Sequence, residues 1–289
     1  MTALYTFLLA VLLSVAGIWL SNRPDVISVQ ASIPDKFPDA GFSHDDFEVL
    51  LTAYVDDEGD VNYSEWYRSP DALEKLHSYL AAVASYSPEN AAERFPHSSD
   101  ALAYWLYAYN AYVIHSILLR WPIDSVTDVK APFEIVKGFG FFYRQRFVFG
   151  GQQYSLYDVE NKKIRSNYKD PRIHFVLNCG SGSCPPMRPD LPTGEQLEEF
   201  LQQATVDFVC DRDNVRIDHD RQRIIVSAIF KWFRKDFENH VVSRGLSGES
   251  AILSYISGVA PQPLKSELDK ARAYDLAFND YDWSVNRAD

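Results

Sequence analysis

The segment 101–119 constrains the fold of this chain more than any other. It reads ALAYWLYAYNAYVIHSILL and contains no formally charged residue, so a helix formed by it has no polar face to turn to water. Its length is compatible with a membrane span. Four tyrosines, together with Asn110 and His115, favour a helix buried at the centre of the fold instead. Because buried amide and imidazole groups need hydrogen-bond partners, we expect this helix to lie against a polar feature.

The rest of the chain alternates between helical and hairpin patterns. Apolar residues at helical spacing predict further helices near 43–54, 73–83, 194–209, 229–242, 248–258 and 262–272. Tight turns predict two β-hairpins, at 146–156 and 214–230, and a short helix follows the first hairpin as far as Arg165. No regular βαβ alternation is present. We therefore predict an α+β fold: a single domain in which a small mixed or antiparallel sheet with hairpins packs against several helices around the buried central helix.

The N-terminus resembles a targeting segment. Residues 5–20 are apolar and uncharged, and Val29-Gln30-Ala31 offers a small-x-small cleavage site. We expect a signal peptide or membrane anchor over 1–31, a linker over 32–42 and one domain over 43–289. The protein would then be exported, either periplasmic or anchored to the inner membrane, and would touch a membrane only through residues 5–20 if these are not cleaved.

The overall charge narrows the class of partner. The 289 residues carry a net charge of −12 with a pI near 5.0, and no cluster of basic residues is present. Binding to phosphate backbones needs such clusters, so a nucleic-acid partner is excluded. We expect a small molecule or an envelope component as partner, and no cofactor.

The segment DPRIHFVLNCGSGSCPP, residues 170–186, gathers the most reactive side chains. Its first part, 172–178, predicts an interior strand with His174 and Asn178 on one face. Cys179 and Cys184 then flank a flexible Gly/Ser loop. In an oxidising compartment these two cysteines favour a disulfide, although a reactive thiol or inert buried thiols are alternatives. The C-x4-C spacing differs from that of zinc sites, so no metal is predicted.

These residues support two functional hypotheses. In the first, the protein catalyses thiol-dependent acyl transfer or hydrolysis, with Cys179 or Cys184 as nucleophile and His174 as base. Glu160 or Asn178 would orient the base, and the amides of residues 180–183 would bind the oxyanion. On an extended strand, however, His174 lies about 17 Å from Cys179, so it could serve Cys184 only if the loop turns back.

The second hypothesis is a non-catalytic binding module of the cell envelope, stabilised by a Cys179–Cys184 disulfide. It would recognise an envelope component through the aromatic-rich helix. Polar side chains near the helix and the loop are the candidate binding residues in either case: Asn110, His115, Arg172, Ser181 and Ser183. The third cysteine, Cys210, ends a helix and is expected to be buried.

Five blocks of this chain resemble, in order, the signature blocks of the DUF547 family of exported bacterial domains. They are YWLYAYNAYVIHSIL, SLYDVENKKIR, DPRIHFVLNCGSGSCPP, IFKWFRKDF and YDWSVN. The resemblance implies one domain but no particular reaction. The residues that match the family pattern are Asn110, Glu160, Asp170, Arg172, His174, Asn178, Cys179, Cys184 and Trp232. One position departs from it: the family has His directly after the glutamate, whereas this chain has Asn161. If that histidine is essential, this chain is impaired.

Overall fold

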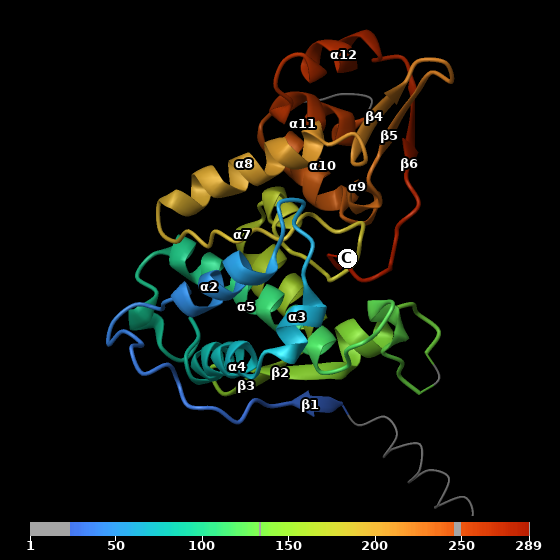
Figure 1. Ribbon diagram of the computed structural model, residues 1–289. Helices are drawn as coiled ribbons and strands as arrows, with labels where there is room; N and C mark the ends of the chain where they lie inside the picture. Colours follow the sequence, from blue (N-terminus) through green and yellow to red (C-terminus); the bar gives the residue numbers. More distant parts are fainter. Residues whose placement is uncertain (1–23, 133, 246–249, 289) are drawn as a thin grey trace, which may run out of the picture.

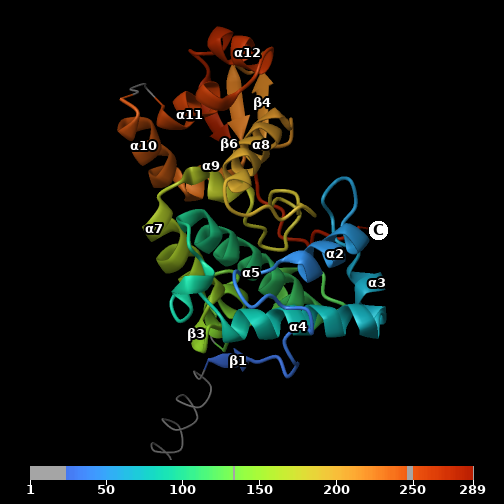
Figure 2. The same cartoon turned by 90° about the vertical axis from the view of Figure 1, so that its left-hand side faces the viewer.

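A computed structural model describes residues 24–132, 134–245 and 250–288. The expected signal or anchor segment 5–20 lies outside these residues. In Figure 1 the elements up to β3, coloured blue to green, form the lower part of the molecule, and α8 to β6, orange to red, form the upper part. The segment that carries the two cysteines runs between the two parts, and the chain returns there at its C-terminus (Figures 1 and 2).

The lower part is built around helix α5. Its elements are β1 (Asp25–Ile27), α2 (Asp45–Tyr54), α3 (Tyr63–Arg68), α4 (Pro70–Ser85), η1 (Ala92–Arg94), α5 (Ser98–Leu118), η2 (Val126–Asp128), η3 (Gly140–Arg144), β2 (Gln145–Phe149), β3 (Gln152–Tyr154), α6 (Leu156–Asp158), η4 (Val159–Arg165) and α7 (Ser166–Tyr168). The upper part follows η5 (Pro171–Phe175) and comprises α8 (Gln196–Cys210), β4 (Val215–Asp218), β5 (Arg223–Val226), α9 (Ala228–Trp232), α10 (Arg234–Ser243), α11 (Ala251–Val259), α12 (Leu264–Lys270) and β6 (Asp275–Phe278).

Helix α5 is buried on all sides, as its sequence predicts. Every residue from Leu102 to Leu118 is buried. Three of its tyrosine hydroxyls donate to backbone carbonyls of neighbouring segments: Tyr104, Tyr107 and Tyr112, at 2.9, 2.6 and 2.6 Å. These bonds satisfy the polar ends of rings that are otherwise packed in the core. No helix of the described ranges combines the length and the hydropathy needed to cross a membrane.

The strands of the described residues form two three-stranded sheets with the same pairing pattern. In one, the antiparallel hairpin β2–β3 is extended by β1, which pairs in parallel with β2. In the other, the antiparallel hairpin β4–β5 is extended by β6, which pairs in parallel with β5. Both hairpins lie where tight turns predict them, and the mixed pairing confirms the predicted α+β class.

Residues before α2 also contact the lower part. Asp25 to Ile27 form β1, and the rings of Phe37 and Phe42, within the expected linker, pack together at 5.2 Å. Phe37 also stacks on Tyr86 beyond α4, at 5.8 Å.

The predicted strand at 172–178 is wrong. Residues Pro171–Phe175 form the 3-10 helix η5. The chain then turns into residues 179–184, here called the cysteine loop. The local sequence explains the difference, because the side chain of Asp170 caps the helix by accepting from the Arg172 backbone at 3.0 Å. Pro171 occupies the first turn, where its missing N–H costs nothing. An apolar run that is buried on all sides does not distinguish a strand from a short helix.

The end of the chain forms a strap between the two parts. Residues 279–288, here called the C-terminal strap, follow β6 and make single bridges to three distant segments: Val61 with Arg287, Ser125 with Ser284, and Ser181 with Val285. The strap thus holds the cysteine loop against the lower part.

Candidate functional site

A pocket of about 200 Å³ lies where the cysteine loop, the strap and helix α5 meet. Eight aromatic rings line it, so we call it the aromatic pocket. Its lining residues are Tyr109, Val136, Lys137, Phe142, Tyr143, Tyr157, Glu160, His174, Leu177, Cys179, Cys184, Pro185, Ile229, Trp232, Phe233, Tyr281 and Trp283. Four of the residues predicted to be catalytic are among them: Glu160, His174, Cys179 and Cys184.

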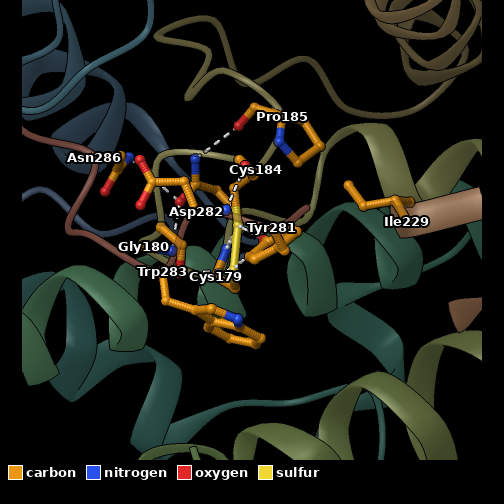
Figure 3. Close-up of a disulfide and its surroundings, with 12 residues drawn as sticks. Cys179, Gly180, Cys184, Pro185, Ile229, Tyr281, Asp282, Trp283 and Asn286 are labelled. Carbon is orange, nitrogen blue, oxygen red and sulfur yellow. Dashed lines mark hydrogen bonds between the residues drawn. A yellow bond between two sulfur atoms is a disulfide. The ribbon is translucent and has the colours of Figure 1, made fainter. Parts of the chain in front are cut away.

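A disulfide joins Cys179 and Cys184 in the pocket wall, with their Cα atoms 6.1 Å apart (Figure 3). The hydroxyl of Tyr281 lies 3.0 Å from the sulfur of Cys179 and 3.1 Å from that of Cys184. Because bridged sulfurs carry no hydrogen, the tyrosine hydroxyl is the donor. The Cys179 backbone N–H also donates to Cys184 Sγ at 2.9 Å. Neither sulfur is a free thiol in this state, and the remaining thiol, Cys210, is exposed rather than buried as predicted.

Two asparagines fix the loop that carries the disulfide. Asn110 on α5 donates from Nδ2 to the Val176 carbonyl at 3.0 Å, and its Oδ1 accepts from the Asn178 backbone at 2.9 Å. Asn178 in turn donates to the Pro185 carbonyl at 2.7 Å and accepts from the Gly180 backbone at 2.8 Å. These amides are the polar feature that the buried helix needs. Asn178 therefore holds the loop together and has no hydrogen bond to His174.

Gly180 allows the loop to pass close to α5. Its φ of +79° lies in the left-handed region, and a Cβ there would come within 2.6 Å of Ile117 Cδ1. Both constraints favour glycine at this position.

His174 is held by a residue from the upper part of the molecule. Its Nε2 lies 2.8 Å from Asp236 Oδ2, and its ring stacks on Phe233 at a centroid distance of 3.8 Å. Burial lowers the pKa of His174, although Asp236 opposes this, so the ring is neutral at pH 7. Since an ionised carboxylate only accepts, Nε2 carries the proton of the neutral ring, and Nδ1 is left as the acceptor.

Asp236 also binds Arg165 through two hydrogen bonds, from Nε to Oδ2 at 2.7 Å and from Nη2 to Oδ1 at 3.1 Å. Burial raises the pKa of Asp236, but the hydrogen bonds from His174 and Arg165 outweigh it and set the pKa at about 2. Arg165 also donates to Asn161, the residue that replaces the family histidine. Asp236, rather than Glu160 or Asn178, therefore orients His174.

Glu160 is the only carboxylate among the lining residues of the aromatic pocket in the described chain. It belongs to η4 and is partly buried. Desolvation raises its pKa to about 7; Arg165 opposes the shift and Asp236 adds to it. Within the described residues no hydrogen bond to this carboxylate is observed, in contrast to Asp236.

The aromatic rings form two groups around this carboxylate. The ring centroid of Trp232 on α9 lies 4.5 Å from that of Tyr281 and 5.6 Å from that of Trp283. Tyr281 and Trp283 both belong to the strap, and their ring centroids are 4.7 Å apart. Tyr143 and Tyr157 stack on each other at 4.3 Å. Trp232 remains about half exposed, at 47 %, so the pocket is open to solvent at this edge.

The predicted binding residues lie elsewhere. His115 is buried beside His77, with burial lowering its pKa to about 3. Arg172 is paired with Asp170 and Glu198. Ser181 and Ser183 line a second depression, here called the polar hollow, which shares Cys184, Pro185 and Tyr281 with the aromatic pocket.

Sequence reasoning missed three residues of the site: Asp236, Tyr281 and Trp283. All three lie in the blocks IFKWFRKDF and YDWSVN. The density of aromatic residues in these two blocks was the available signal, but nothing in the sequence places either block beside His174.

Residues 94–209 match the family described as "Protein of unknown function, DUF547". The resemblance expected from the sequence is confirmed over this region. The centre of the chain is thus similar to the DUF547 family. It contains α5, Glu160, His174 and both bridged cysteines, whereas Trp232, Phe233, Tyr281 and Trp283 come from later in the chain. Neither the curated proteins nor the solved structures include a match to this chain.

Proposed function

We propose that this protein is a non-catalytic binding module that holds a small organic ligand in the aromatic pocket. The observation that carries the proposal is the pocket wall itself, in which eight aromatic rings surround a disulfide instead of a free thiol. Concave sites that are mostly apolar, with a few polar groups, are typical of small-molecule recognition.

The state of the two cysteines argues against the thiol enzyme. A nucleophilic cysteine must be a thiolate with a base in reach. Here each sulfur is bonded to the other and accepts from Tyr281. The proton on His174 Nε2 is used to bind Asp236, which stabilises the ring but supplies no nucleophile.

We further propose that the module works outside the cytoplasm, in the cell envelope. Stable disulfides form in oxidising compartments, and the apolar residues 5–20 fit an export signal or anchor. The ligand would then be an envelope component or a molecule that passes through the envelope.

A thermal-shift screen of small organic compounds, run without reductant, tests the binding function. Compounds that bind the folded state at 100 times their Kd stabilise it by about 2.7 kcal/mol and raise the melting temperature. We expect hits whose effect is lost in Trp232→Ala, a half-exposed residue of the pocket. The matched control Tyr67→Ala, a similarly exposed aromatic on α3 outside the pocket, keeps the effect.

The same protein sample decides between the two hypotheses. Alkylation without reductant should modify only Cys210. Rapid alkylation of Cys179 or Cys184, together with an empty screen, would overturn the binding module and restore the thiol enzyme.

A further inference from the structure

Glu160 lies in the aromatic pocket, and among the described residues its carboxylate has no hydrogen-bond partner and no salt bridge. The guanidinium of Arg165, which lies nearby, makes two hydrogen bonds to Asp236 and one to Asn161. The Arg165–Asp236 pair is thereby internally neutral, and His174 is neutral as well. Once ionised, Glu160 leaves one negative charge at the pocket that none of these groups balances.

The rings around Glu160 suit a positive charge. The electron-rich faces of tryptophan and tyrosine attract cations, most strongly where water is excluded. The structure contains an example at the edge of this pocket, since Lys137 places its ammonium 5.2 Å from the centroid of Trp283. Lys137 itself is exposed.

We propose that the aromatic pocket binds a small organic cation, a quaternary or protonated amine, through its aromatic rings and the carboxylate of Glu160. The inference rests on the binding function proposed above and names its ligand class. The volume of about 200 Å³ falls below the roughly 300–1,000 Å³ of pockets for drug-sized ligands. The ligand is therefore a compact amine, or the amine head of a longer molecule that leaves the pocket at the open edge beside Trp232.

Other ligand classes fit this chemistry less well. An anion would meet the charge of Glu160, and its only cationic lining partner in the described chain is Lys137 at the rim. A neutral polar ligand such as a sugar would leave the charge of Glu160 without a counter-ion. The carboxylate of Glu160 among the aromatic rings is the feature that selects the cation.

The titration of Glu160 makes the affinity for a cation depend on pH. The charged and titratable groups around it come from every neighbouring element: Arg165 on its own helix, Tyr109 on α5, Tyr143 on η3, Tyr157 on α6, His174 on η5, Asp236 on α10, Tyr281 in the strap, and Lys137 at the rim. Of these, Glu160 changes charge near pH 7, because burial raises its pKa to about 7. Affinity for a cation should therefore rise between pH 6 and pH 8.

Calorimetric titration of the disulfide-bonded protein at pH 8 tests the inference with two probes of the same shape. One is choline, and the other is its neutral analogue 3,3-dimethylbutan-1-ol. We expect choline to bind at least about 10-fold more tightly, and Glu160→Gln to remove most of that difference without weakening the neutral probe. Glu199→Gln, an exposed residue on α8, makes the same change of net charge away from the pocket and should have no effect.

A second variant should act in the opposite direction. Lys137→Gln removes the competing cation from Trp283 and should strengthen choline binding a few-fold. Equal binding of both probes would overturn the proposal of a cationic ligand but leave the proposed binding function intact. Binding of neither probe would also overturn the cation, and the compound screen would then decide the binding function separately.

Discussion

The aromatic pocket and the polar hollow lie against the same disulfide, yet they treat carboxylates in opposite ways. The polar hollow is lined by six acidic side chains: Glu58, Asp60, Asp211, Asp213, Asp280 and Asp282. Asp211 accepts from the Asp213 backbone and from Asn214, each at 2.9 Å, and Asp282 accepts from the backbone and the hydroxyl of Ser284. The carboxylates of Asp211 and Asp282 thus stabilise turns within their own segments.

In the aromatic pocket one carboxylate, Glu160, has no such local donor, and the partners of its neighbour Asp236 come from 62 and 71 residues away in sequence. The difference teaches that the number of acidic residues does not reveal a binding site. What distinguishes Asp211 and Asp282 from Glu160 is that nearby donors already bind their carboxylates. Asp211 and Asp282 in the polar hollow have such donors, whereas Glu160 in the aromatic pocket has none among the described residues.

The largest expected effect on stability comes from replacing one aspartate beside the aromatic pocket, and the comparison is a replacement of one aspartate in the polar hollow. Asp236→Ala leaves both Arg165 and His174 without their partner in a partly buried site, so it should lower the free energy of unfolding by about 3 kcal/mol. Asp282→Ala in the polar hollow removes only exposed local bonds and should cost less than about 1 kcal/mol. Urea unfolding of both variants measures the difference, and equal losses would contradict it.

The disulfide between the aromatic pocket and the polar hollow gives the next largest expected effect on stability. The double variant Cys179→Ser/Cys184→Ser opens a bridge between residues five apart, which should lower the free energy of unfolding by about 2 kcal/mol. It should also weaken ligand binding, since the Tyr281 hydroxyl loses the sulfurs that hold it. Cys210→Ser, at the exposed free thiol, serves as the control and should leave urea unfolding unchanged. A loss confined to the Cys210 variant would show that the bridge contributes nothing.

The smallest effect concerns Glu160 and depends on pH. Its folded-state pKa of about 7 lies above its usual 4.5, so the folded protein holds a proton that the unfolded chain releases. The stability linked to this proton is fully present below pH 4.5 and is lost as pH rises through 7. Glu160→Gln should therefore be more stable than the wild type at pH 8, by on the order of 1–2 kcal/mol, and no more stable at pH 4. Melting curves at both pH values measure this, and a gain that does not change with pH would refute the raised pKa.

The sequence predicted those parts of the fold that local pattern determines. The absence of charge between residues 101 and 119 placed α5 in the centre, and the turns at Gly150-Gly151 and at 218–220 located both hairpins. The disulfide was one of several alternatives, because spacing alone cannot reveal the redox state of Cys179 and Cys184. The strand at 172–178 failed because the cap of Asp170 determined the local geometry.

The partners of the site residues could not be predicted, for a different reason. Glu160, His174 and the two cysteines were identified as candidates, and they do line one pocket. Asp236 and Tyr281 reach them from 62 and about 100 residues further along the chain. No local periodicity encodes such contacts, because they depend on how the upper part packs on the lower part.

The C-terminal strap implies an order of events during folding, in which the disulfide forms before the strap docks on it. Cys179 and Cys184 are separated by 5 residues and can be cross-linked as soon as both meet an oxidant, whereas Tyr281 must return across 102 residues to meet them. Contacts of such long range form late in folding. We therefore expect a newly made chain to pass through a stage in which the cross-link exists but the strap is still open. Reductants and disulfide-exchange enzymes have access to the bridge at that stage, and docking of Tyr281 ends it.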